Sequence, residues 1–346
     1  MTSSSNLAAR RPSVGIVLVF LSNVCFGTTG PAGKAVMGAG LSPLHVVQLR
    51  ISGAAVALLL IALARDPKSL RMTRRDLPLL LAYGLIGFLG VQSLYFVAMS
   101  RLPVGVALLL EYLAIVLVAL WAKFVQKRAL ARTTWIGMVL TVVGLALIEQ
   151  VWRGLVLDAV GGIAGLGAAV CLAGYFLLSE RGLGGRDPIA LAAWGASVGA
   201  MAAAVISPPW QIPLARLRET AQLGPLTTPA WVALLYVILI GTVAAYLSGI
   251  AALRHLSSPV VGILSTFEVV VAAGTAWLLL GERLNAVELT GALILFTGVV
   301  LAQVGSNPPT TVKTAAANSS QPRRSTTASS SSTPRRSRDD AVSTLR

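Results

Sequence analysis

The chain has 346 residues, of which 55% are hydrophobic and 12% charged, and its mean hydropathy is +0.77. A soluble domain carries about twice that charged fraction, so the composition excludes an ordinary water-soluble protein and indicates a polytopic membrane protein. The formal net charge of +15 does not indicate binding to nucleic acid, because the cations are spread over separate hydrophilic segments of the chain and form no single basic stripe.

Ten apolar segments are long enough to cross a bilayer. A helix of about 20 apolar residues spans the hydrocarbon core of roughly 30 Å, and a backbone without access to water must satisfy its own hydrogen bonds there. We therefore expect an all-α integral membrane protein with ten transmembrane helices. The predicted spans are residues 14–30, 43–64, 77–100, 104–124, 133–150, 155–179, 188–206, 230–253, 259–280 and 286–304.

The domain organisation follows from these spans. Residues 1–13 form a polar tail, and residues 14–150 and 151–304 hold five spans each. Residues 305–346 are rich in Pro, Ser, Thr and Arg, a composition that cannot bury enough apolar surface to fold. We expect this basic C-terminal tail to be disordered. A cleaved signal peptide is the alternative for the first span, but the polar Asn23 within it argues against cleavage.

The two halves resemble each other in sequence. One alignment brings Gly137 onto Gly291 and Gly144 onto Gly298. Because each copy holds an odd number of spans, the second copy must enter the membrane from the opposite side. Inverted repeats of this kind are typical of secondary transporters, whose substrate site lies between the halves near the middle of the membrane.

The cations indicate how the chain is oriented. With the N-terminus inside, the inner loops and tails hold most of the Lys and Arg residues, as the positive-inside rule requires. We therefore expect a multi-pass protein of the cytoplasmic (inner) membrane with both termini in the cytoplasm. The cations that remain in the outer loops are Lys34, Arg101, Arg153, Arg216, Arg218 and Arg283.

Three ionisable residues fall inside the predicted spans. Glu111 and Glu268 lie about 12–13 Å from opposite ends of corresponding spans, and Arg50 lies about 10 Å inside the second span. A charge at this depth is expensive and is a functional candidate by default. The carboxylates are candidates for carrying a proton or binding an ammonium group, and Arg50 for binding a carboxylate. The alternative is a structural ion pair between Arg50 and Glu111.

Further polar residues lie at similar depth on several spans. Gln92 and Tyr246 occupy equivalent positions of the two copies, and Asn23, Tyr95 and Tyr175 lie on other spans. Each of them alone is more often a hydrogen bond between helices than a ligand contact. Together with the charged residues they would suit a polar cavity for a substrate.

The sequence favours no enzyme, and we assign no catalytic residue, cofactor or metal. A Lys–Ser/Thr phosphate loop and a metal-binding Cys/His cluster are both missing from the sequence. Cys25 and Cys171 are interpreted as small helix-packing residues. Asp158 and Glu282 fall near helix ends and are expected to be solvated.

Several short segments resemble the drug/metabolite transporter superfamily of the EamA type. They are Leu280-Gly-Glu-Arg-Leu284, Ser258-Pro259 followed by Phe267-Glu268, and the closing glycines Gly291 and Gly298. The segment from Ser100 to Tyr112 resembles the threonine/homoserine exporter branch.

This resemblance implies ten helices in two inverted repeats, cytoplasmic termini, and transport of small metabolites, often amino acids outward, by alternating access through a central cavity. Relatives often carry a proline after the position of Glu111. Here the chain reads Leu113-Ala114-Ile115, so the kink is expected to be absent.

The leading hypothesis is a secondary active transporter that exports a small polar metabolite, an amino acid or a derivative. Its partners would be this substrate, the lipid bilayer and protons as a candidate coupling ion, with no nucleic acid, and it would be a monomer or a homodimer. One alternative is an exporter of lipophilic cations, for which more aromatic lining is expected. The other alternative is a membrane scaffold without transport.

Overall fold

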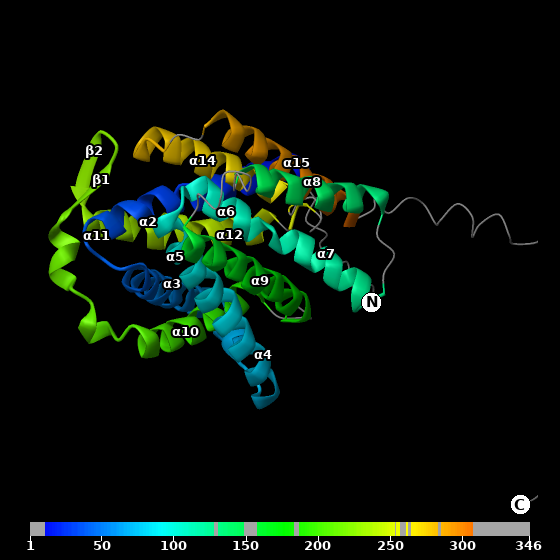
Figure 1. The fold of residues 1–346 in the computed structure, drawn as a ribbon. Coiled ribbons are helices and arrows are strands. Elements are labelled where there is room, and N and C mark those ends of the chain that lie inside the picture. The colour runs from blue at the N-terminus through cyan, green and yellow to red at the C-terminus, as the bar shows by residue number, and fades with distance from the viewer. Residues whose placement is uncertain are drawn as a thin grey trace, which may run out of the picture. The chain divides into compact units, whose positions relative to one another are not determined.

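The computed structural model describes residues 11–127, 131–148, 158–182, 187–252, 254–256, 261, 264–282 and 285–306. These residues are mostly helical, and the helices lie alongside one another (Figure 1). The helices are α1 (Pro12–Gly27), α2 (Thr29–Gly38), α3 (Pro43–Arg65), α4 (Leu77–Ala82), α5 (Val91–Arg101), α6 (Val104–Tyr112), α7 (Ala114–Phe124), α8 (Arg132–Ile148), α9 (Ala159–Gly182), α10 (Pro188–Ile206), α11 (Ala230–Ile238), α12 (Ala245–Ala252), α14 (Phe267–Leu280) and α15 (Ala286–Ser306).

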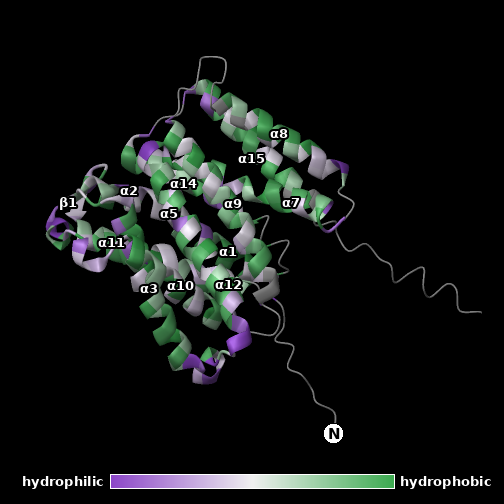
Figure 2. Ribbon diagram, turned by 60° about the horizontal axis from the view of Figure 1, so that its bottom comes forward, coloured by the Kyte–Doolittle hydropathy of each residue, from purple (hydrophilic) through white to green (hydrophobic). Residues whose placement is uncertain are grey.

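The surface of these helices is apolar, as expected for a protein surrounded by lipid. Hydrophobic residues run along the helices, and hydrophilic residues gather near their ends (Figure 2). Ile163, Met201 and Val205 are more than two-thirds exposed, at 72%, 73% and 81%. In the described part of the chain, seven helical segments are long and apolar enough to cross a membrane. The protein is therefore a multi-pass membrane protein with a helical fold.

The first of these segments is longer than predicted. It runs over 27 residues, Pro12–Gly38, as α1 and α2 with an interruption at Thr28. The prediction ended this span at residue 30 because Pro31 and Lys34 follow. Pro31 lies in the first turn of α2, where a missing N–H is tolerated. Lys34 is accommodated by an ion pair with Glu282.

Two spans contain a π-helical stretch. The third predicted span consists of α4, the π-helix η3 (Tyr83–Gly90) and α5. The eighth consists of α11, the π-helix η7 (Leu239–Ala244) and α12. Such stretches occur frequently at functional sites, and these two interrupt corresponding spans of the two halves.

The fourth predicted span is also interrupted. Helix α6 ends at Tyr112, and α7 begins at Ala114. Between them the amide of Leu113 donates to the carbonyl of Leu110, three residues back, at 3.1 Å. The α-helix is therefore interrupted two residues after Glu111 although no proline follows. A local tightening of the backbone produces this interruption.

Helices α8 and α15 pack with their backbones in contact (Figure 1). A Cβ added at Gly144 would lie 2.6 Å from the carbonyl oxygen of Gly291, and one added at Gly298 would lie 2.6 Å from that of Gly137. These contacts run antiparallel. Small residues allow such close approach between membrane helices, which explains the four glycines that the sequence alignment matched in pairs.

The loop after α10 contains the only strands in the part of the chain that is described. Strand β1 (Thr220–Leu223) pairs antiparallel with β2 (Leu226–Pro229). Gly224 in the connecting turn has a φ of 63°, a left-handed conformation that favours glycine. The all-α prediction did not include this hairpin.

The predicted tails are described only at their inner edges. Helix α1 begins at Pro12, and α15 ends at Ser306, each two residues beyond the predicted boundary. The rest of the predicted C-terminal tail, residues 307–346, lies outside the described residues, as do residues 1–10 and the boundary between the two predicted repeats.

The contact between α8 and α15 gives a stability prediction. We expect Gly144→Ala to lower the free energy of unfolding by about 1–3 kcal/mol, because the added methyl group forces the two backbones apart. The matched control is Gly162→Ala on α9, where an added Cβ meets nothing within 4 Å. Thermal unfolding in detergent measures both variants, and equal stability of the two would contradict the packing described.

Candidate functional site

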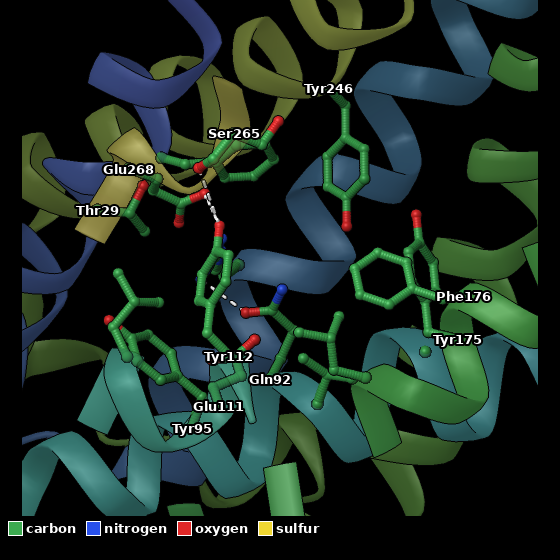
Figure 3. A pocket seen from close by; sticks show the side chains of 16 residues that line it. Thr29, Gln92, Tyr95, Glu111, Tyr112, Tyr175, Phe176, Tyr246, Ser265 and Glu268 are labelled. Carbon is green, nitrogen blue, oxygen red and sulfur yellow. Dashed lines mark hydrogen bonds between the residues drawn. The ribbon is translucent and has the colours of Figure 1, made fainter. Parts of the chain in front are cut away.

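A cavity of about 230 Å³ lies among the helices of both halves. Side chains from widely separated parts of the sequence point into it (Figure 3). It includes seven of the eight candidate residues, namely Arg50, Gln92, Tyr95, Glu111, Tyr175, Tyr246 and Glu268. The remaining lining residues are Phe26, Thr29, Gly87, Val91, Leu108, Tyr112, Leu172, Phe176 and Ser265.

The guanidinium of Arg50, on α3, donates hydrogen bonds to side chains of two other helical segments. Its Nε donates to Oγ1 of Thr242 at 2.8 Å, and Nη1 donates to Oε1 of Gln92 at 2.7 Å. The guanidinium lies 5.4 Å from the ring centroid of Phe96, within the range of a cation–π interaction. The side chain is only 3% exposed. These contacts fix the position of the guanidinium beside the cavity.

The π-helix η7 supplies one of these contacts. Thr242 within it donates to the carbonyl of Val237, five residues back, at 2.8 Å, while it accepts from Arg50. The hydroxyl of Thr242 in this wider π turn thus bonds at the same time to its own helix backbone and to the guanidinium of Arg50. This links the irregular backbone of the eighth span to the charge on the second.

Glu268 lies in the first turn of α14 and is bound by a tyrosine. The hydroxyl of Tyr112, at the end of α6, donates to Oε2 of Glu268 at 3.0 Å and lies 3.2 Å from the carbonyl of Ser265 (Figure 3). The two residues come from the two interrupted regions of the fourth and ninth predicted spans. Their contact joins the halves of the chain at the cavity.

Glu111 faces the cavity without a protein partner among the described residues. Its side chain has neither a hydrogen bond nor an ion pair there, although it is 8% exposed. The suggested structural ion pair between Arg50 and Glu111 is not formed, because Arg50 uses Thr242 and Gln92 instead. A buried carboxylate in this state is open to a ligand, water or a proton.

Aromatic rings form much of the remaining wall. Tyr246 stacks on Phe88 with centroids 5.7 Å apart, and Tyr175 stacks on Tyr83 at 5.1 Å. In Figure 3 the hydroxyls of Tyr246 and Tyr175 point toward the interior. Tyr95, on α5, lines the other side. The cavity therefore combines charged groups with flat apolar faces.

Asn23 does not line the cavity. It is 1% exposed, and its Nδ2 donates to the carbonyl of Leu264 at 2.7 Å. This hydrogen bond joins α1 to the segment before α14. Asn23 therefore contributes to helix packing, which is the more common role of a polar residue within a membrane helix.

Sequence reasoning left out several residues of the site. Tyr112, Thr29, Ser265 and Thr242 are not among the candidates predicted from the sequence. Their hydroxyls are common in membrane helices and usually bond to their own backbone. Only the three-dimensional contacts with Glu268 and Arg50 distinguish Tyr112 and Thr242 from the other hydroxyls.

The described residues contain no group of three or more His, Cys, Asp or Glu side chains placed to hold a metal ion. The ionisable side chains on the cavity are one cationic and two acidic groups, together with tyrosines. Such a set can bind a small molecule that carries both charges.

The family pattern of EamA-like transporters matches residues 13–150 and, a second time, residues 159–303. The chain belongs to the EamA-like transporter family. The resemblance seen in the short motifs is thereby confirmed, and membership in this family assigns the protein to membrane transport.

Curated relatives and a solved structure agree with this family. The threonine/homoserine exporter RhtA of Escherichia coli is 28% identical over 280 residues, which cover 79% of this chain and 86% of the relative. RhtA of Salmonella typhimurium is 28% identical over 254 residues, covering 72% and 77%. One protein crystal structure superposes with a TM-score of 0.58 at 17% identity, covering 84% of this chain and 96% of that one, so the two share a fold.

The anchoring of Arg50 by η7 gives a second stability prediction. We expect Thr242→Val to lower the free energy of unfolding by about 1–3 kcal/mol, because it leaves a buried charged donor without its acceptor. The control is Thr290→Val, whose exposed hydroxyl bonds only to the carbonyl of Ala286 in its own helix. Thermal unfolding in detergent compares the two, and an equal effect would contradict the anchoring role of Thr242.

Proposed function

We propose that the protein is a secondary active transporter that exports a small polar metabolite, an amino acid or a derivative, by alternating access. The observation that carries this proposal is the cavity in which Arg50, Glu111 and Glu268 meet inside apolar helices. A zwitterion offers a carboxylate to the guanidinium and an ammonium group to the carboxylates. The two curated relatives named above, which export threonine and homoserine, support this substrate class.

The transporter would consist of ten transmembrane helices in two inverted five-helix repeats. The glycine contacts between α8 and α15 support this arrangement. Gly137 meets Gly298 while Gly144 meets Gly291, so replacing both residues of one contact by their repeat equivalents gives the other contact. Such reciprocity is the property of a two-fold axis. The π-helices η3 and η7 and the two matches to the family pattern agree with this division.

The volume of the cavity supports a small substrate. Sites for drug-sized ligands have about 300–1,000 Å³, whereas this cavity has about 230 Å³. In the proposed mechanism, Arg50 binds the substrate carboxylate, and Gln92, Tyr95, Tyr175 and Tyr246 contact the remainder. Glu111 and Glu268 bind the ammonium group or exchange it for a proton as the cavity opens alternately to each side.

The protein would lie in the cytoplasmic membrane, as a monomer or a homodimer, with both termini in the cytoplasm. This orientation rests on the excess of Lys and Arg in the loops assigned to the inner side.

An exporter of lipophilic cations is a second candidate. The aromatic side chains on the cavity favour it, because aromatic faces attract cations. They are more numerous than the sequence suggested, namely Phe26, Tyr95, Tyr112, Tyr175, Phe176 and Tyr246. Arg50 opposes this candidate, because it places a fixed positive charge beside the ligand.

Proteoliposome flux measurements test the proposed function. We expect threonine or homoserine efflux to depend on a pH gradient and Glu268→Gln to reduce it by about tenfold or more, because the amide cannot exchange a proton at this depth. Glu288→Gln is the matched control, since Glu288 is partly exposed at the start of α15 and its carboxylate accepts from the nearby amide of Asn285.

Unchanged pH-coupled flux in Glu268→Gln would rule out the role proposed for this carboxylate. Flux of tetraphenylphosphonium without flux of any amino acid would favour the second candidate instead.

A further inference from the structure

A cluster of polar contacts lies where α2, α6 and the C-terminal end of α14 meet. Nζ of Lys34, on α2, forms an ion pair with Oε1 of Glu282 at 2.5 Å and donates to the carbonyl of Leu102 at 3.1 Å. The other oxygen of Glu282 accepts from the backbone amide of Val104 at 2.8 Å. The side chains of Lys34 and Glu282 are only 29% and 16% exposed, so Glu282 is not solvated as the sequence suggested.

The loop between α5 and α6 is therefore fastened on several sides. Arg101, the last residue of α5 before this loop, pairs with Asp158, directly before α9, at 2.9 Å. Asp158 also accepts from the amide of Gly161 at 2.8 Å, and its side chain is 37% exposed, in agreement with the expectation that it is solvated. Both ion pairs in the described residues thus meet at one loop and join it to the second half of the chain.

Packing below this cluster separates it from the cavity. A Cβ added at Gly30 of α2 would lie 2.9 Å from the hydroxyl of Tyr95 and would clash with Val104. On the other side of α6, a Cβ added at Gly105 would lie 3.2 Å from Cβ of Ala273 on α14. The start of α6 is thus packed between α2 and α14, close to the ion pair. Tyr95, which contacts α2 at Gly30, lines the cavity.

We infer that Lys34, Glu282 and the backbone amide of Val104 form a gate that keeps the cavity closed at this end and must open for the substrate to leave. The inference rests on the proposed transport function, because alternating access requires one end to open when the other closes. Opening the gate costs little free energy, because the ion pair is partly exposed and water replaces its hydrogen bonds as α2 and α14 separate.

The position of the gate indicates which side of the membrane it controls. In the proposed orientation this end faces the outside, since it carries the loops assigned to the outer surface. The hairpin β1–β2 packs against α2 at the same end (Figure 1). The structure thus corresponds to a state closed toward the outside.

Labelling of a single cysteine tests the gate without requiring transport. In a Cys25→Ala, Cys171→Ala background, Leu108→Cys places a thiol on α6 between the gate and Glu111. A membrane-impermeant maleimide is applied to right-side-out and inside-out vesicles. Hydrogen exchange of the segment 101–106 provides a second measurement that does not depend on the introduced thiol.

We expect Lys34→Met and Glu282→Gln, which preserve side-chain size, to raise the labelling rate in right-side-out vesicles about fivefold, equivalent to ~1 kcal/mol. Exchange in the segment 101–106 should rise in parallel. Lys34→Arg, which keeps the charge, and Lys68→Ala, in an exposed loop on the opposite side of the predicted topology, should behave as the parent protein.

Unchanged labelling and unchanged exchange in both Lys34→Met and Glu282→Gln would overturn the gate. A rise seen only in inside-out vesicles would support the gate but overturn the proposed orientation. Neither readout involves a substrate, so a failure to find flux would count against the proposed function alone.

Discussion

A guanidinium that is 3% exposed within apolar helices must have its donors satisfied by the protein. Two of the five N–H groups of Arg50 find acceptors in Thr242 of η7 and Gln92 of α5, and these bonds bring the second, third and eighth predicted spans together. An unpaired charge at this depth would be costly, so the position of Arg50 constrains the helices around it. The cavity and its acidic residues lie within the space that these contacts define.

The two acidic residues of the cavity differ in their hydrogen bonding. Glu268 accepts a hydrogen bond from Tyr112, whereas Glu111 has no such partner among the described residues. Both lie beside interruptions of the helical backbone, at Leu113 and at Thr266. The two carboxylates therefore reach one cavity from different helices and in unequal states, one bound by a hydroxyl and one without such a bond among the described residues.

The sequence was sufficient to predict the helical membrane fold, the family and seven of the sixteen residues that line the cavity, because apolar length and intramembrane charge are strong signals. Asn23 shows where such reasoning ends: its depth equals that of the cavity residues, but its side chain bonds to Leu264. Glu282 shows the converse, since its position at a helix end gave no indication of its pairing with Lys34. Depth along a span can be read from spacing, whereas the direction of a side chain depends on how distant helices pack.

The π-helices η3 and η7 offer a way to rotate the parts of the helices that follow them. A π turn accommodates one residue more than an α turn, and each residue of an α-helix advances about 100° around its axis. Conversion of η3 to a regular helix would therefore rotate α5 with Gln92, and the same change in η7 would rotate α12 with Tyr246. Each of these two spans thus contains a segment whose change between π and α geometry would reorient a wall of the cavity while both ends of the span remain helical.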